Sequence, residues 1–95
     1  MSEIERHDTP TKGSYLLREP GGAVAELSFS KAGTTMIIID HTEVPEAFRG
    51  QGAGIQLVTR AVEDARAAGL KIIPLCPFAQ AQFRRHSDWA DVLKG

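Results

Sequence analysis

The feature that most constrains the fold is an apolar strand that leads through a short polar loop into a glycine-rich helix start. The strand is expected over Thr34 to His41, and it carries the run Met36-Ile37-Ile38-Ile39. After the loop, residues 52–68 have the periodicity of an amphipathic helix, and Gly69 is placed to cap its end. Free N–H groups and the positive end of the helix dipole make such a start a natural anion site. We therefore expect the loop to hold the pyrophosphate of a bound cofactor.

The predicted helix separates apolar from polar side chains along its length, as a helix packed on a sheet does. Its buried stripe is expected to contain Ile55, Val58, Ala61, Val62 and Ala65. Its solvent side is expected to carry Gln56, Arg60, Glu63, Asp64 and Arg66.

Strand-like alternation occupies most of the remaining chain. Residues 14–19 and 23–30 are separated by the turn Pro20-Gly21-Gly22, and with residues 34–41 they predict a three-stranded antiparallel meander. Residues 71–75 form a short strand after the helix, so this strand is expected to run parallel to 34–41 through a right-handed crossover. The sequence thus predicts a compact α+β domain in which a meander precedes a βαβ unit.

Prolines mark where the second half of the chain changes direction. Pro74 has no N–H for a sheet ladder, which indicates that the two parallel strands have splayed apart by this point. Pro77 suits the first turn of a helix with residues 79–84 as its body. A last short helix, from about 87 or 88 to 93, is expected to dock Trp89, Val92 and Leu93. Residues 1–12 lack a clear period and are expected to be a loosely ordered lead-in to a single domain spanning residues 1–95.

Composition excludes several classes of function. The chain has 95 residues and a net charge of −1, without the excess of Lys and Arg that nucleic-acid binding requires. No apolar run is long enough for a membrane span, so a cytoplasmic protein is expected. One cysteine makes neither an internal disulfide nor a multi-cysteine metal site, and no metal is predicted. We expect a monomer or a small homo-oligomer.

The glycine loop fits one phosphate-binding pattern and fails two others. The P-loop needs Lys followed by Ser or Thr after its last glycine, and the dinucleotide fingerprint needs a later third glycine and a larger domain. The loop instead matches Arg/Gln-x-x-Gly-x-Gly/Ala through Arg49, Gly52 and Gly54. It resembles the coenzyme A loop of the GNAT superfamily of N-acetyltransferases. The resemblance covers about residues 15–93, including Pro74-Leu75-Cys76-Pro77, and is to the small single-domain GNAT-like subfamily.

The resemblance implies a site for acetyl-CoA, with an amine of a small molecule or protein as acceptor. Backbone N–H groups from Gln51 to Ile55 would bind the pyrophosphate, and the backbone near Thr42 to Val44 would pair with pantetheine between the splayed strands. Arg49 is interpreted as a phosphate contact or loop brace. The expected cofactor-binding residues are Thr42, Val44, Arg49, Gly50, Gln51, Gly52, Ala53, Gly54, Ile55, Pro77 and Arg84.

The chain departs from larger superfamily members in two ways that bear on function. The helices that usually follow the first strand, and form much of the acceptor site, are replaced by the turn Pro20-Gly21-Gly22. The late helix offers Phe83 and Arg84 where larger members often place a tyrosine acid, and the single tyrosine is Tyr15. A CoA-binding regulatory or interaction module with little turnover is therefore the alternative to an N-acetyltransferase.

Three residues are the catalytic candidates. Cys76, at a strand end before a helix, is either a nucleophile or acid facing the thioester, or a small buried hydrophobic residue. His41 ends the facing strand, where it is expected to approach Cys76 as base or activator, and the alternative is a surface residue. Glu43 is the other candidate base, and the alternative is that it is an exposed carboxylate in a loop. Phe78, Phe83 and Trp89 are expected in the core.

Overall fold

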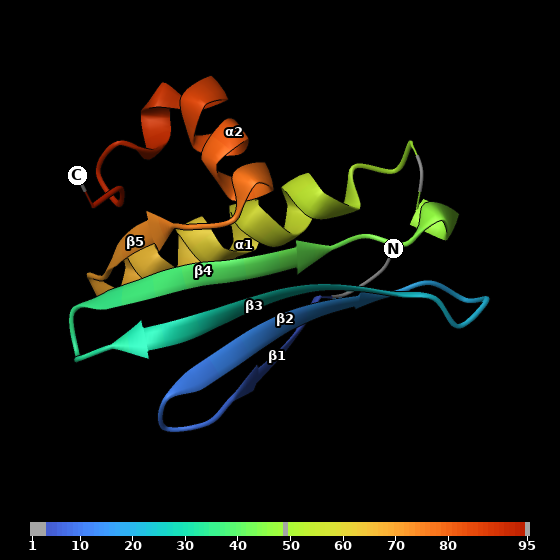
Figure 1. The fold of residues 1–95 in the computed structure, drawn as a ribbon, viewed down its shortest axis with the longest axis horizontal. Helices are drawn as coiled ribbons and strands as arrows, with labels where there is room; N and C mark the ends of the chain where they lie inside the picture. The colour runs from blue at the N-terminus through green and yellow to red at the C-terminus, as the bar shows by residue number, and fades with distance from the viewer. Residues whose placement is uncertain (1–3, 49, 95) are drawn as a thin grey trace.

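The computed structural model describes residues 4–48 and 50–94 of the chain. Within these residues it has a mixed five-stranded sheet of order β1-β2-β3-β4-β5, with two α-helices on one of its faces (Figure 1). Strands β1 to β4 pair antiparallel, and β5 pairs parallel with β4. The elements are β1 (Ile4–Asp8), β2 (Lys12–Arg18), β3 (Val24–Ala32), β4 (Met36–Glu43), the 3-10 turn η1 (Glu46–Phe48), α1 (Ala53–Ala68), β5 (Lys71–Pro74), α2 (Pro77–Arg85) and the 3-10 turn η2 (Ser87–Trp89). The α+β class and the βαβ unit are confirmed.

Strand β1 corrects the prediction of a loosely ordered lead-in over residues 4–8, and it extends the meander from three strands to four. Residues 1–3 of that prediction lie outside the described residues. Its residues pair with β2 in the register Ile4↔Leu17 and Arg6↔Tyr15. The strand is not evident in the sequence because most of its side chains are charged. An edge strand can carry ion-pairing groups at positions where a central strand carries apolar ones. The Arg6 guanidinium lies over the Tyr15 ring, 5.4 Å from its centroid.

The core lies between the sheet and α1, and the predicted stripe of α1 is largely confirmed. The buried helix residues are Ala53, Gly54, Leu57, Val58, Ala61, Val62 and Ala65. Ile55 is wrongly predicted, because its side chain is 41% exposed while Leu57 is fully buried. The helix begins at Ala53, and the face that meets the sheet repeats at 54, 57, 58 and 61, which leaves residue 55 on the outer side near the loop.

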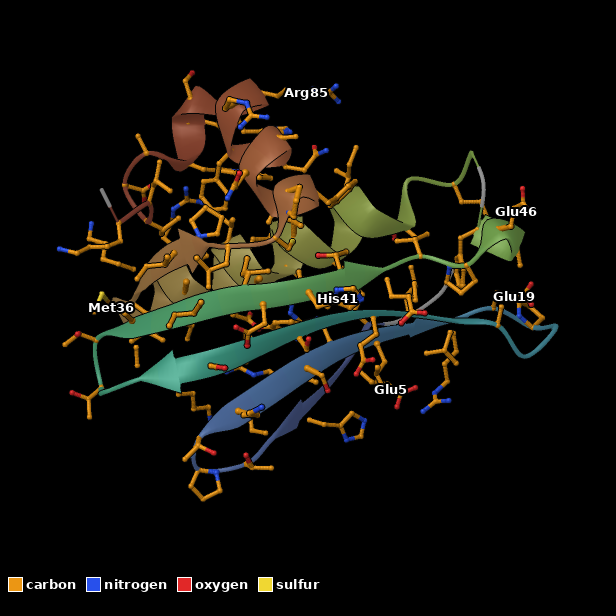
Figure 2. All side chains as sticks on the ribbon, in the orientation of Figure 1. Glu5, Glu19, Met36, His41, Glu46 and Arg85 are labelled. Carbon is orange, nitrogen blue, oxygen red and sulfur yellow. The ribbon has the colours of Figure 1, made fainter. Side chains whose placement is uncertain are left out.

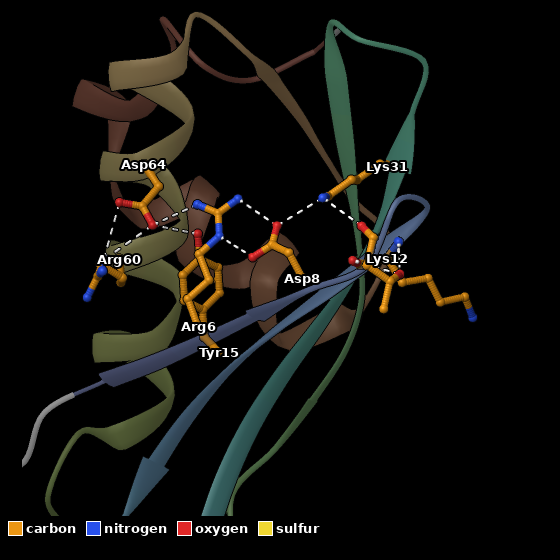
Figure 3. Close-up of polar contacts among 8 residues, drawn as sticks. Arg6, Asp8, Lys12, Tyr15, Lys31, Arg60 and Asp64 are labelled. Carbon is orange, nitrogen blue, oxygen red and sulfur yellow. Dashed lines mark hydrogen bonds and ion pairs between the residues drawn. The ribbon is translucent and has the colours of Figure 1, made fainter.

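A polar network joins α1 to the first two strands (Figure 3). The Tyr15 hydroxyl donates to Asp64 Oδ2 at 2.7 Å, and Asp64 also accepts from Arg6 at 3.0 Å and from Arg60 at 3.2 Å. Burial alone would raise the pKa of Asp64, but hydrogen bonds from Tyr15, Arg60 and Arg6 outweigh it and hold the pKa below its usual value. Asp64 therefore does not point into solvent as predicted; it ties the helix to the sheet.

The other face of the sheet, here called the open face, carries no α-helix among the described residues (Figure 1). Directly paired antiparallel residues share a face, so the register assigns each side chain to one side. Leu27 is buried beneath the helices and pairs with Thr42, which places Thr42 on the helix side. His41 and Glu43 flank Thr42 and therefore lie on the open face, where Ser28 pairs with His41.

Strands β4 and β5 separate where the sequence predicts. Their parallel pairing ends at Ile39↔Pro74, while β4 continues along β3 as far as Glu43. The N–H groups of Leu75 and Cys76 both donate to the Ile39 carbonyl, at 3.1 and 3.3 Å, and so close the base of the split. Beyond this point the β5-side edge of β4 has no strand partner among the described residues, which confirms the splayed pair.

The C-terminal segment contains less helix than predicted. After α2, only the 3-10 turn η2 forms, and the chain then returns to the sheet, where Leu93 bridges Ile72. Trp89 and Val92 are buried as expected, but Leu93 is 37% exposed, so its predicted docking is wrong. Trp89 stacks on His86, with ring centroids 4.0 Å apart. The helix ends at His86 because this residue has φ −120° and ψ 80°, outside the helical region.

Candidate functional site

A hollow of about 350 Å³ lies where the end of β4, the glycine loop and the first turns of α1 and α2 meet. We call it the loop hollow. Its lining is mostly apolar and consists of Thr42, Val44, Phe48, Gly50, Gly52, Ala53, Gly54, Ile55 and Phe78. Seven of the residues predicted to bind the cofactor therefore line one hollow.

The conformation of the loop depends on two glycines in the left-handed region. Gly50 has a φ of 77° and Gly52, the N-cap of α1, has a φ of 68°, which L side chains rarely adopt. Two glutamine side chains brace the turn: Gln51 Nε2 donates to the Ala47 carbonyl at 3.1 Å, and Gln56 Nε2 donates to the Gln51 carbonyl at 3.0 Å. The loop is thus held in shape before any ligand arrives.

The start of α1 presents backbone donors with no acceptor. The first helical hydrogen bond is Gln56 N–H to the Gly52 carbonyl, and Gly52 makes no side-chain cap. Within residues 4–48 and 50–94, the N–H groups of Gly52, Ala53, Gly54 and Ile55 have no protein acceptor. No acidic residue occupies the first turn. These donors, together with the helix dipole, fit a phosphate or pyrophosphate.

The third glycine of the motif has a steric role. A Cβ on Gly54 would lie 2.6 Å from Phe78 Cζ, so the glycine lets the start of α2 approach the start of α1. Phe78, predicted in the core, is 37% exposed and forms a wall of the loop hollow. With Val44 and Ile55, which are 40% and 41% exposed, it offers an apolar surface beside the anion site. The combination suits an elongated ligand with an anionic part and a less polar arm.

Cys76 lies at the base of the split between β4 and β5. It is the N-cap of α2, and its sulfur accepts the Ala79 N–H at 3.3 Å. Thr42 Oγ1 is 3.3 Å from the same sulfur, across the split. The thiol is 6% exposed. The sulfur is therefore buried at the base of the split, with the Ala79 N–H and the Thr42 hydroxyl as its polar neighbours.

His41 does not approach Cys76, and that prediction is wrong. The pairs Phe29↔Ile39 and Ser28↔His41 leave Asp40 as an extra residue, a bulge in β4. Without the bulge, alternation from the buried Ile39 would turn His41 toward the helices; with it, His41 lies on the open face. Figure 2 labels His41 on β4, where its side chain is 67% exposed and 3.9 Å from Glu43.

The remaining predicted residues lie at the margins of the site. Arg49 is outside the described residues. Pro77 is the first residue of α2, whereas Arg84 is exposed in the last turn of that helix and does not line the loop hollow. Phe48, whose buried ring closes the hollow, is not among the residues predicted from the sequence. Neither is Gln82, which is 4% exposed and whose Oε1 has no hydrogen-bond partner.

Within residues 4–48 and 50–94, no group of three or more His, Cys, Asp or Glu side chains is placed to hold a metal ion. None of the helices in the described part of the chain is long and apolar enough to cross a membrane.

Comparison with known proteins places the fold and the loop in a family. The family described as GCN5-related N-acetyl-transferase matches residues 14–92. The NMR structure of a GCN5-like candidate N-acetyltransferase from Staphylococcus aureus is 33% identical, covers 100% of this chain and 92% of its own, and has a TM-score of 0.74. The crystal structure of nourseothricin acetyltransferase, 24% identical over 82% of this chain and 50% of its own, shares the fold with a TM-score of 0.63. Curated protein sequences gave no match. The chain therefore belongs to the GCN5-related N-acetyltransferase family.

Proposed function

We propose that this protein is an acetyl-CoA-dependent N-acetyltransferase that transfers the acetyl group to an amine. The observation that carries the proposal is that one hollow contains both the free N–H groups of the α1 start and the open edge of β4. Acetyl-CoA has a matching pair of parts, a pyrophosphate and a long arm that ends in the thioester. Family membership supplies the acetyl-transfer chemistry.

Each part of the site has a role in this proposal. The N–H groups of residues 52–55 would hold the pyrophosphate, with Gly50 and Gln51 shaping the loop. The backbone of Thr42 to Val44, which β5 leaves unpaired, would bind the arm as an added strand does. When bound, acetyl-CoA supplies an activated acyl carbon at the end of this arm. The proposed binding residues thus lie along the split between β4 and β5, from the glycine loop to the base of the split.

Two roles are open to Cys76, and both use its position at the base of the split. As an acid it would protonate the sulfur of the departing CoA thiolate; as a nucleophile it would take the acetyl group before the amine does. Thr42 Oγ1, 3.3 Å from the cysteine sulfur, orients it in either case. His41 and Glu43 lie on the open face, where an incoming amine can lose its proton to one of them.

A CoA-binding regulatory module is the second candidate, and two observations favour it. The open face lacks an α-helix among the described residues, so no helical wall encloses an acceptor. Tyr15, the single tyrosine, donates to Asp64 within the core and is not available as an acid. On this alternative, CoA binds in the loop hollow with little turnover.

The chain contains a matched pair of glycines for testing the binding site. Gly52 in the loop and Gly33 in the β3–β4 turn have φ values of 68° and 65°, and at both an added Cβ meets nothing within 4 Å. Gly52→Glu and Gly33→Glu therefore add equal strain and equal charge. CoA at about a hundred times its dissociation constant should stabilise the parent and Gly33→Glu by about 2.7 kcal/mol, and Gly52→Glu far less. Equal stabilisation of both variants, measured by thermal unfolding, would refute the site.

Activity separates the enzyme from the module, and the role of Cys76 follows from mass measurement. CoA release with an amine acceptor supports the enzyme, while CoA binding without release for any amine supports the module. Intact mass after incubation with acetyl-CoA should show an added acetyl group on the parent, absent in Cys76→Ala, if the cysteine is a nucleophile. Turnover without an adduct, reduced in Cys76→Ala, assigns the cysteine as acid.

A further inference from the structure

Gln82 on α2 carries a buried amide that pairs with nothing in the described part of the chain. Its side chain belongs to the buried face of α2, together with Ala79 and Phe83. It is 4% exposed, and its Oε1 accepts no hydrogen bond from residues 4–48 and 50–94. Burying an unpaired amide destabilises a fold. Folding therefore gains nothing from an amide at this position, whereas a ligand that pairs with it would.

Helix geometry places the Gln82 side chain next to Phe78. The two residues are four positions apart on α2, so their side chains lie on one side of the helix, one turn apart. Helical side chains lean toward the N-terminus of their helix, which brings the Gln82 amide toward the Phe78 ring. This end of α2 begins at Cys76, at the base of the split. The amide thus leans toward the end of the helix that forms part of the site.

The Phe78 ring separates this amide from the loop hollow. The ring lines the hollow, and a Cβ on Gly54 would lie 2.6 Å from its Cζ, so the ring fills the space between the starts of α1 and α2. It is 37% exposed and has room to change rotamer without opening the core. A turned ring would leave the Gln82 amide in the wall of the hollow.

The group that suits a glutamine amide is a secondary amide. A glutamine side chain both donates and accepts hydrogen bonds, and a secondary amide does the same. The free N–H groups of residues 52–55, which fit a pyrophosphate, are next to the Phe78 ring. In CoA the arm that follows the pyrophosphate contains secondary amides, whereas the nucleotide part contains none. The order of groups along CoA thus matches the order of anion site and amide in the protein.

We propose that Gln82 is a specificity-determining residue, which hydrogen-bonds a secondary amide of the CoA arm once the Phe78 ring has turned aside. This rests on the proposed function, in which the open edge of β4 at Thr42 to Val44 binds the same arm from across the split. The arm is then held between a backbone edge and a side-chain amide. A ligand with a pyrophosphate but no amide arm satisfies only the loop, so the site selects CoA over other pyrophosphates.

Two probes separate the arm of CoA from its nucleotide. One is CoA, and the other is adenosine 3′-phosphate 5′-diphosphate, the part of CoA that contains the pyrophosphate and has no amide. Gln82→Met keeps the length of the side chain and removes its hydrogen bonds. It should weaken CoA about fivefold, because one hydrogen bond to the arm is lost, and leave the nucleotide unchanged. Titration calorimetry on the full chain measures both affinities.

Gln80→Met is the matched control. Gln80 is exposed on the same helix, nearly opposite Gln82 around its axis, and donates to the Leu75 carbonyl at 3.2 Å. The same substitution there should change neither affinity. NMR of the parent gives a direct signal. The side-chain NH₂ resonances of Gln82, assigned by their loss in Gln82→Met, should shift when CoA is added and stay in place when the nucleotide is added.

The outcomes keep this inference apart from the proposed function. If neither probe binds the parent, the proposed function is wrong. If CoA binds and Gln82→Met weakens it no more than it weakens the nucleotide, the amide does not contact the arm, and this inference alone is overturned. A melting temperature of Gln82→Met below that of the parent would show that the amide already has a partner in the free protein, such as a buried water, and would also overturn it.

Discussion

Replacing Tyr15 by phenylalanine tests the network that joins α1 to the sheet. Tyr15 is 1% exposed, and its hydroxyl donates to Asp64 Oδ2 at 2.7 Å. A hydrogen bond to a charged group contributes about 1.5–3 kcal/mol. Asp64 keeps Arg6 and Arg60 as partners and its side chain is 26% exposed, so water and the arginines recover part of the loss. We expect Tyr15→Phe to lower the free energy of unfolding by about 1.5 kcal/mol, or about 6–12 °C in melting temperature.

The assay is urea denaturation of four proteins in a double-mutant cycle. Tyr15→Phe, Asp64→Ala and the double variant give the coupling energy of the pair, which should exceed about 0.5 kcal/mol because the two groups are in contact. Glu63→Gln, next to Asp64 but exposed, is the control and should stay within about 0.5 kcal/mol of the parent. A coupling energy near zero would mean that the hydrogen bond does not stabilise the fold.

The pH dependence of stability tests the contact between Tyr15 and Asp64 at both acid and alkaline pH. The pKa of Asp64 is lowered, so its contribution is present above about pH 3.9 and is lost as pH falls through the folded pKa. Burial, and then the hydrogen bond to Asp64, raise the pKa of Tyr15; its contribution is present below about pH 10 and is lost as pH rises toward the folded pKa. Because Tyr15 is the single tyrosine, the change in ultraviolet absorbance when tyrosinate forms reports this residue alone. Titration at the ordinary value, while the protein stays folded, would refute the burial argument.

Three other substitutions have effects set by their surroundings. Gly13→Ala puts a Cβ 2.2 Å from Phe29 Cζ, whose ring is 1% exposed and unable to move, so urea denaturation should show a loss of about 1–3 kcal/mol. Gly54→Ala meets Phe78 Cζ at 2.6 Å, but that ring is 37% exposed and can turn away; stability should fall by less than about 1 kcal/mol, while CoA stabilises the variant less than the parent. Gln82→Met removes a buried acceptor that has no partner and should raise stability by about 1 kcal/mol in the same assay.

The sequence predicts those elements whose pattern and local chemistry agree. The run Met36 to Ile39, the glycines of the loop and the prolines at 74 and 77 each restrict the backbone, and the structure confirms the strand, the loop before α1 and the split. The loop hollow follows from the same signals, since it is built largely from backbone. Here local rules and tertiary structure require the same conformation.

The sequence does not predict those features of the fold that depend on contacts between distant parts of the chain. The charged residues of β1 are explained by partners that are distant along the chain: Arg6 reaches Asp64, 58 positions away, while Glu5 pairs with Arg18 and Asp8 with Lys31. Ile55 has the correct apolarity for the core stripe, but it lies at the edge of the buried face of α1, beside the loop, and Leu57 takes the buried position. Phe78 lines the loop hollow, and an apolar residue in such a wall cannot be distinguished in the sequence from one packed in the core.

The bulge at Asp40 decides which side chains of β4 reach the proposed site. In an unbroken strand, alternation from Ile39 would turn His41 and Glu43 toward the helices and Thr42 toward the open face. The extra residue reverses this, so that Thr42 meets the Cys76 sulfur while His41 and Glu43 face the carboxylate of Glu26. One inserted position therefore places Thr42 beside the loop hollow and leaves His41 and Glu43 on the open face. A periodic pattern does not reveal such an insertion, because Asp40 and His41 are both polar and fit either register. For this reason the sequence wrongly predicts that His41 approaches Cys76.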